Sequence, residues 1–444
     1  MTLVLRNVRP WGGPQVDVGI ADGVIAAMGA NLQLAGEEID GRGGLLLPGL
    51  HDHHLHILAL AARRQSIDLA GLTDADQVAY RLRAAPGEGW VRAVGYDERT
   101  AGLPDAQQLD RWLRHRPLRL ADRTGALRVL NTAALERIKG QALPPGAERD
   151  AAGQPTGRFW REDRWLAQAL PQTLPDLAAE GRSLAAMGLT ALTDATAHNG
   201  PDEARILAGA IPQRLTLMGS EALMAGPGFK LGPLKLAIDE RDLPPVDALA
   251  ERIVGAHRLG RAVAAHCVTE TELAIYLAAL EAAGGAHSGD RIEHGGMIPP
   301  AFMAVIADKG LQVATNPAFI HDRGDRYAAT IDRDQWEDLY PAAGLLRAGI
   351  ALLGGSDAPY ASPDPWLAMR AGYSRRSVGG VVLGAGQRLS ALSALRLYCT
   401  GAIAPGSKAD LILCCGTMTD VLADLCLDRL LLTLIAGRIA FSRD

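Results

Sequence analysis

The feature that most constrains the fold is an alternation of short apolar, strand-like runs with helix-like stretches through the middle of the chain. Such alternation is typical of βα units that build a parallel sheet. Eight candidate strands lie at residues 46–56, 190–195, 214–218, 234–238, 262–266, 291–294, 312–315 and 350–354. Eight units in a chain of 444 residues favour an α/β fold with a (β/α)8 TIM-like barrel.

Both ends of the chain are also rich in strand-like segments and turns. We expect residues 1–47 and 404–444 to form one small β-sandwich domain, and residues 48–403 to form the barrel. The interval between the first and second candidate strands is much longer than a compact barrel needs. It has its own strand-like runs, at residues 90–94 and 118–121. We therefore expect an inserted α/β subdomain at residues 62–164, after the first barrel strand.

The charge and hydropathy of the chain argue against several classes of partner. The formal net charge is −5, so the basic excess of a nucleic-acid-binding protein is absent. No apolar run reaches the ~18–20 residues of a membrane span, and the first residues alternate like a strand rather than a signal peptide. The five cysteines include no Cys-x-x-Cys pair and do not suggest a disulfide framework. We expect a cytoplasmic protein with a small-molecule substrate, without nucleic-acid or membrane partners; a homodimer remains open.

The first candidate strand carries an unusual density of histidines. Residues 48–56 read Pro-Gly-Leu-His-Asp-His-His-Leu-His. Because residues two apart in a strand share a face, His54 and His56 can point together into a barrel. Imidazole nitrogens are common ligands of zinc and similar ions. The segment therefore predicts part of a metal site.

Further ligand-type residues stand near the ends of other candidate strands. Lys235, His266, His294 and Asp357 fall on the fourth, fifth, sixth and eighth strands. The intervals between them correspond to about one, one and two βα units. Barrel enzymes place their chemistry at the C-terminal ends of the strands, so this register predicts one shared site.

This arrangement resembles the amidohydrolase superfamily of metal-dependent hydrolases over nearly the whole chain. The resemblance implies that His54, His56, His266, His294 and Asp357 belong to the metal site. Within the superfamily the chain is similar to the branch that includes N-substituted formamide deformylases. The similar segments are residues 90–97, 131–135, 155–157, 291–294, 355–359 and 403–410.

Two substitutions depart from the pattern of that branch. Ala126 stands where the branch often has a histidine, in an Asp-Gly-His sequence. Arg161 stands where the branch tends to have a glutamate, with Glu162 one place later. Both segments help to shape the substrate pocket of the branch, so the resemblance does not fix the substrate.

The resemblance implies a hydrolase of a non-peptide C–N bond, in an amide, N-acyl or N-formyl compound. A metal-activated hydroxide would attack the carbonyl carbon, and Asp357 would act as general base and then general acid. His294 is the second candidate catalytic residue. An alternative is a metal-dependent deaminase of a heterocycle, but such relatives usually have a glutamate where Thr269 stands here. A non-catalytic scaffold of the same fold is a remote alternative.

The expected cofactor is a divalent metal, with zinc favoured by the donor set, and its stoichiometry depends on Lys235. In some relatives a lysine on the fourth strand is carboxylated and bridges two ions. Without that modification, one ion would be bound by His54, His56, His266 and Asp357. Burial lowers the pKa of a lysine, which favours the neutral amine that carboxylation requires, but pairing with a carboxylate is an equally open reading.

Two loop histidines are candidates for contact with the substrate. His198 follows the second candidate strand, and His321 lies in the long segment after the seventh. Loops at the C-terminal ends of the strands carry most substrate contacts in barrel enzymes.

Overall fold

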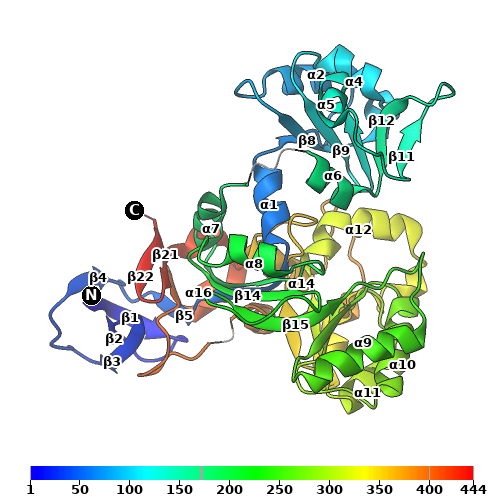
Figure 1. The fold of residues 1–444 in the computed structure, drawn as a ribbon. Helices are drawn as coiled ribbons and strands as arrows, with labels where there is room; N and C mark the ends of the chain where they lie inside the picture. The colour runs from blue at the N-terminus through cyan, green and yellow to red at the C-terminus, as the bar shows by residue number, and fades with distance from the viewer. Residues whose placement is uncertain (1, 171–173, 400, 444) are drawn as a thin grey trace. The chain divides into compact units, whose positions relative to one another are not determined.

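The computed structural model describes residues 2–170, 174–399 and 401–443 (Figure 1). The chain forms two compact units. The first contains Met1–Ile57 and Leu177–Asp444, and the second contains Leu58–Asp176. The second interrupts the first in sequence, after the first strand of the barrel.

A ring of parallel strands forms the centre of the first unit, which confirms the predicted barrel. Each strand pairs with the next in parallel, and the order along the sheet follows the chain. The ring closes where Asp357 N donates to His54 O (2.7 Å) and His56 N donates to Ala358 O (2.8 Å). The strands are β6 (Leu50–Leu55), β13 (Leu189–Asp194), β14 (Arg214–Gly219), β15 (Lys230–Leu236), β16 (Val263–Cys267), β17 (Arg291–His294), β18 (Gln312–Thr315) and β19 (Leu352–Gly354).

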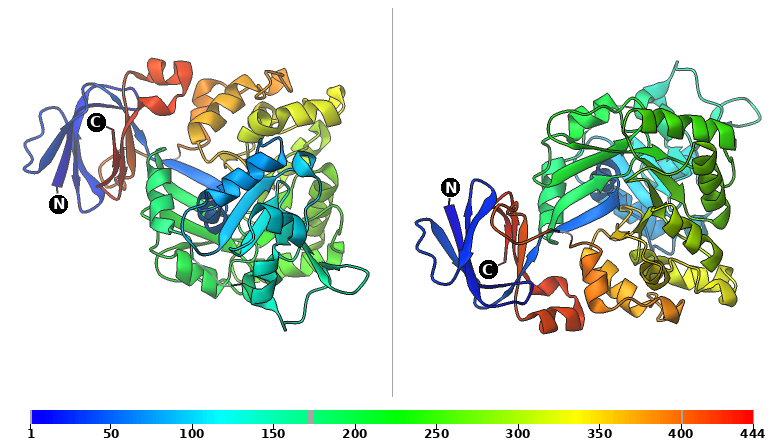
Figure 2. Two further views of the ribbon diagram at one scale, coloured as in Figure 1. Left: turned by 90° about the horizontal axis from the view of Figure 1, so that it is seen from above. Right: turned by 90° about the horizontal axis from the view of Figure 1, so that it is seen from below.

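Helices surround this ring in Figure 2. Helix α9 is amphipathic, as a helix that covers a barrel is expected to be, and it buries Leu249, Ile253 and Ala256. The helices are α7 (Leu177–Ala185), α8 (Pro201–Leu207), α9 (Val246–Arg258), α10 (Glu270–Ala282), α11 (Pro300–Asp308), α12 (Ala318–Thr330), α13 (Ala342–Arg347), α14 (Pro365–Ser374) and α15 (Ala391–Arg396). None of the helices in the described ranges is both long enough and apolar enough to cross a membrane.

Strands from the two ends of the chain join in one sheet, seen in blue and red in Figure 1. Its order is β22-β21-β20-β5-β1-β2-β3, and β4 pairs with β1. Leu5, Ile25, Leu46, Leu411 and Leu434 are among the residues of its apolar core. The strands are β1 (Thr2–Pro10), β2 (Val16–Ala21), β3 (Val24–Gly29), β4 (Glu37–Asp40), β5 (Leu45–Pro48), β20 (Leu411–Cys414), β21 (Leu430–Ile435) and β22 (Arg438–Ser442), and α16 (Met418–Asp424) follows β20.

The expected first barrel strand, residues 46–56, is divided between two sheets. Strand β5 pairs with β20 in the terminal sheet, and β6 pairs with β13 in the barrel. The chain changes sheets at Gly49, whose N–H donates to Asp410 O at 2.8 Å. A Cβ at this position would lie 2.2 Å from the Thr190 side chain. Only glycine fits this crossing, so the prediction of one continuous strand was wrong.

The second unit is an α/β layer with its own sheet. The strand order is β11-β12-β10-β9-β8-β7, and two apolar clusters lie within the unit. Helix α1 (Ile57–Arg64) leads into it. The strands are β7 (Ile67–Asp68), β8 (Val91–Tyr96), β9 (Leu118–Asp122), β10 (Leu127–Leu130), β11 (Ala147–Arg149) and β12 (Pro155–Trp160). The helices are α2 (Ala75–Arg83), α3 (Glu98–Ala101), α4 (Ala106–Trp112), α5 (Thr132–Leu135) and α6 (Asp163–Ala169).

Asn131 is the central polar residue of this second unit. Its side chain is fully buried. The side-chain oxygen accepts from Leu118 N (2.9 Å) and from Ala134 N (3.0 Å), the second bond capping α5. The side-chain nitrogen donates to Leu113 O (2.8 Å) and Arg116 O (2.9 Å). The residue thus satisfies four buried backbone groups, and its role here is structural.

We expect Asn131→Ala to lower the free energy of unfolding of this unit by about 2–4 kcal/mol, because buried donors and acceptors lose their partners. Thermal or urea unfolding followed by circular dichroism measures the change. The matched control is Gln141→Ala, since Gln141 is exposed and makes one long hydrogen bond. Equal stability of the two variants would contradict the assignment.

Candidate metal centre

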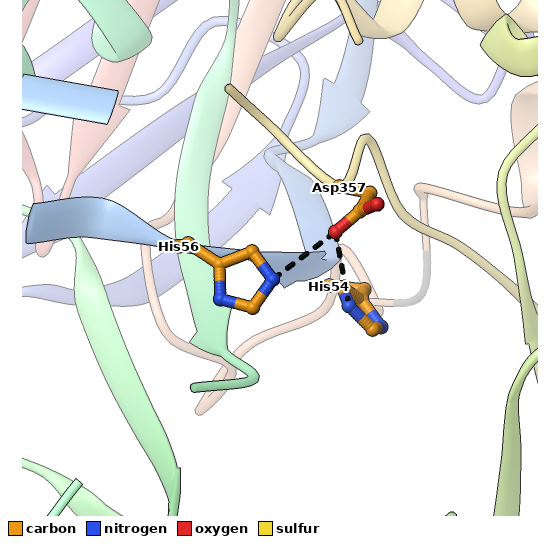
Figure 3. Close-up of side chains that lie close together, drawn as sticks. All are labelled: His54, His56 and Asp357. Carbon is orange, nitrogen blue, oxygen red and sulfur yellow. Dashed lines mark hydrogen bonds and ion pairs between the residues drawn. The ribbon is translucent and has the colours of Figure 1, made fainter. Parts of the chain in front are cut away.

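Three predicted ligands converge at the C-terminal end of the barrel. His56 Nε2 lies 3.1 Å from Asp357 Oδ1, and His54 Nε2 lies 3.3 Å from the same oxygen. One possible ligand atom from each residue falls within 4.8 Å of the others. Figure 3 shows both imidazoles directed at the carboxylate. The pairing of His54 with His56 on one face follows from the alternation of the strand.

The backbone around these residues is held by a buried carboxylate. Asp52 Oδ1 accepts from His54 N and from Ser356 N, both at 3.0 Å. Gly355 allows the two segments to approach, because a Cβ there would lie 2.5 Å from the His54 Cβ. Asp52 and Gly355 therefore set the distance between the first barrel strand and the segment that carries Asp357.

Each of the two histidines has an outer partner that orients its ring. His54 Nδ1 bonds to Glu293 Oε2, which leaves Nε2 facing Asp357. His56 Nδ1 shares a hydrogen bond with Thr196 Oγ1 at 2.8 Å, which leaves its Nε2 facing the same carboxylate. Such outer partners fix the ring orientation of metal-binding histidines.

Glu293 is the functional residue that the sequence analysis missed. Its side chain is completely buried and also pairs with Arg291 Nε. Burial alone would raise the pKa of this carboxyl, but Arg291, Lys235 and His54 together hold it well below its usual range. The sequence signal for Glu293 was its position in the segment Arg-Ile-Glu-His, two residues after Arg291 and directly before the candidate ligand His294.

His266 and His294 lie beside the cluster. The ring centroids of His266 and His294 are 4.5 Å apart, and those of His54 and His294 are 4.6 Å apart. His294 Nδ1 bonds to Asn316 Oδ1 at 2.8 Å. Burial lowers the pKa of His266 to about 4 and that of His294 well below its usual value. Both imidazoles are therefore neutral near pH 7, as metal ligands must be.

Lys235 also reaches this region of the barrel. The residue is 5% exposed, and its Nζ has no hydrogen-bond partner among the described residues. Glu293 Oε2 lies 3.9 Å from it. Burial lowers the pKa of the amine, although Glu293 opposes this. The amine is thus buried, and Glu293 is the carboxylate that pairs with it.

The two candidate substrate contacts lie elsewhere. His198 is exposed in the loop after β13. His321 lies on α12, where its Nδ1 pairs with Asp322 Oδ1 at 2.8 Å. Among the residues that the structure describes, neither side chain contacts the His54–His56–Asp357 cluster, and their assignment to substrate binding remains a prediction.

The chemistry of the donor set fits a divalent cation. Burial would raise the pKa of Asp357, but the hydrogen bonds from His54 and His56 hold it well below its usual range. The carboxylate is therefore ionised and faces the Nε2 atoms of His54 and His56. Glu293 and Asp357 also bind opposite nitrogens of the same buried His54 ring. Two carboxylates around one imidazole concentrate negative charge that a cation would neutralise.

Comparisons with known proteins agree with this description. The sequence profile of the amidohydrolase family matches residues 37–441. YtcJ of Bacillus subtilis (strain 168), named as an amidohydrolase, is 24% identical over 86% of this chain and 85% of its own. N-substituted formamide deformylase of Arthrobacter pascens is 24% identical over 85% of this chain and 84% of its own. An uncharacterized metal-dependent hydrolase of Pyrococcus furiosus shares the fold, with a TM-score of 0.75 at 20% identity, covering 93% of this chain and 98% of that one.

Glu293→Gln tests the outer partner of His54. We expect a ~10–100-fold loss of divalent-metal affinity, because the glutamine is neutral and no longer fixes the ring by a charged hydrogen bond. Competition with a metal-binding dye gives the dissociation constant. Glu281→Gln is the control, since Glu281 is exposed and pairs with Lys309 on the surface. Unchanged affinity in Glu293→Gln would show that His54 does not depend on this carboxylate.

Proposed function

The chain belongs to the amidohydrolase family and is a hydrolase of carbon–nitrogen bonds, and from this we propose that it cleaves a non-peptide amide of the N-acyl or N-formyl type. The observation that carries the proposal is the Asp357 carboxylate, buried between the His54 and His56 nitrogens. A buried, ionised carboxylate at the C-terminal end of a barrel strand is well suited to accept a proton.

We propose zinc as the resident metal, because imidazole nitrogens with a carboxylate are typical zinc donors. His54, His56, His266, His294 and Asp357 are the residues that would hold it. When bound, a divalent ion would act as a Lewis acid toward the carbonyl group and lower the pKa of water. The arrangement of the donors at the mouth of the barrel supports this assignment.

Asp357 is proposed to carry the proton through the reaction. Its carboxylate accepts a proton from water as the water oxygen bonds to the carbonyl carbon. It then donates that proton to the amide nitrogen as the C–N bond breaks, so that a carboxylic acid and an amine leave. The backbone bond from Asp357 N to His54 O (2.7 Å) keeps the carboxylate in place for both transfers. A base that becomes the acid in this way contributes ~10²–10⁴-fold to the rate.

Thr269 occupies the position at which the deaminase alternative would require a glutamate. Thr269 lies three residues after His266, and its hydroxyl accepts from Glu272 N as the cap of α10. The side chain at this position therefore supports the helix rather than offering a proton-shuttling carboxylate. Ammonia release from a panel of pyrimidines and pterins is the measurement that would revive the deaminase alternative.

Asp357→Asn is expected to lower kcat for an N-formyl or N-acetyl amide by ~10²–10⁴-fold, because asparagine cannot accept the proton. Turnover is measured by amine release, and the rate is divided by the metal content of each preparation. Asp308→Asn, an exposed substitution on α11, is the control. If Asp357→Asn retained wild-type turnover per bound metal, Asp357 would not be the base.

Lys235 determines how many ions the site holds. We propose that it is carboxylated, because its buried Nζ has no hydrogen-bond partner within the described part of the chain. Elemental mass spectrometry should then find about two ions per chain in bicarbonate buffer, and about one in Lys235→Met. The control is Lys309→Met, which removes a lysine paired with Glu281. About one ion in the wild type would show that Lys235 is unmodified.

A further inference from the structure

Helix α12 carries a half-buried cation, Arg323, beside the candidate centre. Its guanidinium carbon lies 3.8 Å from the centroid of the Phe319 ring. Its Nη2 donates to the backbone oxygen of Tyr360 at 3.0 Å. The side chain is therefore anchored at two points, one on its own helix and one on the segment after β19.

Both anchors contact histidines of the centre. The Phe319 ring stacks on His294, with centroids 6.3 Å apart and an angle of 14° between the ring planes. The Tyr360 ring meets His56 edge-on, with centroids 5.6 Å apart. Arg323 is thus separated from each of two candidate ligands, His294 and His56, by a single aromatic residue.

The charge of Arg323 is not neutralised within the protein. No carboxylate forms an ion pair with it in the described ranges. The neighbouring acids of α12 have other partners: Asp322 accepts from Ser362 N (3.2 Å), and Asp325 accepts from Gly379 N (2.8 Å). A guanidinium that lies over an aromatic ring keeps the N–H donors in its plane available for hydrogen bonds. The geometry of these donors matches that of a carboxylate. Arg323 therefore has the position and the unused charge to bind an anion.

We propose that Arg323 binds the carboxylate of the substrate, so that the enzyme acts on N-acylated amino acids. The inference rests on the proposed amide hydrolysis and names its substrate class. One aromatic ring separates the cation from His294, so the carboxylate lies close to the scissile amide, as it does when it is carried by the leaving amine.

The test compares N-acetyl-leucine and N-formyl-leucine with their neutral carboxamides, using metal-loaded enzyme. We expect the wild type to favour the acids in kcat/KM by at least about tenfold, since charge-assisted bonds to arginine are strong. Arg323→Met should lose this preference while it still hydrolyses the carboxamides, and Arg323→Lys should keep part of it. Arg333→Met is the matched control, because Arg333 is exposed and lies over Trp336 in a similar cation–π contact.

Binding of the product amine gives a second measurement that does not require turnover. Calorimetry should show leucine binding the wild type at least about tenfold more tightly than leucinamide, with no difference in Arg323→Met. Equal binding of the two, or binding of neither, overturns the role of Arg323. An acid preference that persists in Arg323→Met overturns it as well. If leucine is preferred but no amide is hydrolysed, the anion site stands and the proposed reaction fails.

Discussion

The closure of the barrel between its first and last strands is the constraint on which the centre depends. The backbones of His54 and Asp357 are joined by a hydrogen bond of 2.7 Å. Asp52 also joins the same two segments, because its carboxylate accepts hydrogen bonds from His54 N and Ser356 N. Because one pair of segments both closes the ring and supplies three candidate ligands, the spacing of the donor atoms is a property of the whole barrel. A change that opens the ring would separate His54 from Asp357 before it disturbed either side chain.

Glu293 balances the charges inside the barrel that this closure buries. It contacts His54, Arg291 and Lys235, and Arg291 in turn donates to His53 O at 2.8 Å. A buried ion is tolerated when it is paired and hydrogen-bonded, and it is costly when a partner is removed. Glu293 therefore links the orientation of a ligand to the stability of the core, so its effects on metal affinity and on folding are coupled.

The sequence was sufficient for the barrel and for the convergence of His54, His56 and Asp357, because both follow from the regular spacing of strands and from alternation within one strand. It was insufficient for Glu293, since the contact that orients His54 joins residues 239 positions apart in the chain. The same limit applies to His257, which bonds to the buried carboxylate of Asp290 with a side chain 5% exposed. Pattern analysis identifies faces of elements, whereas these polar pairs depend on which elements meet.

Two candidate ligands of the centre have strained backbone conformations. His294 and Asp357 adopt φ values of 71° and 58°, a region that costs a non-glycine residue of order 1–3 kcal/mol. Both occur where a strand ends and a candidate ligand must turn inward. The hydrogen bonds from His294 Nδ1 to Asn316 Oδ1 and from His54 N and Ser356 N to Asp52 offset part of this cost. A bound cation would favour the same strained conformations, because a ligand that binds only the folded state stabilises that state. The strain and the clustered carboxylates thus act in the same direction: they make the folded barrel more stable with the ion than without it.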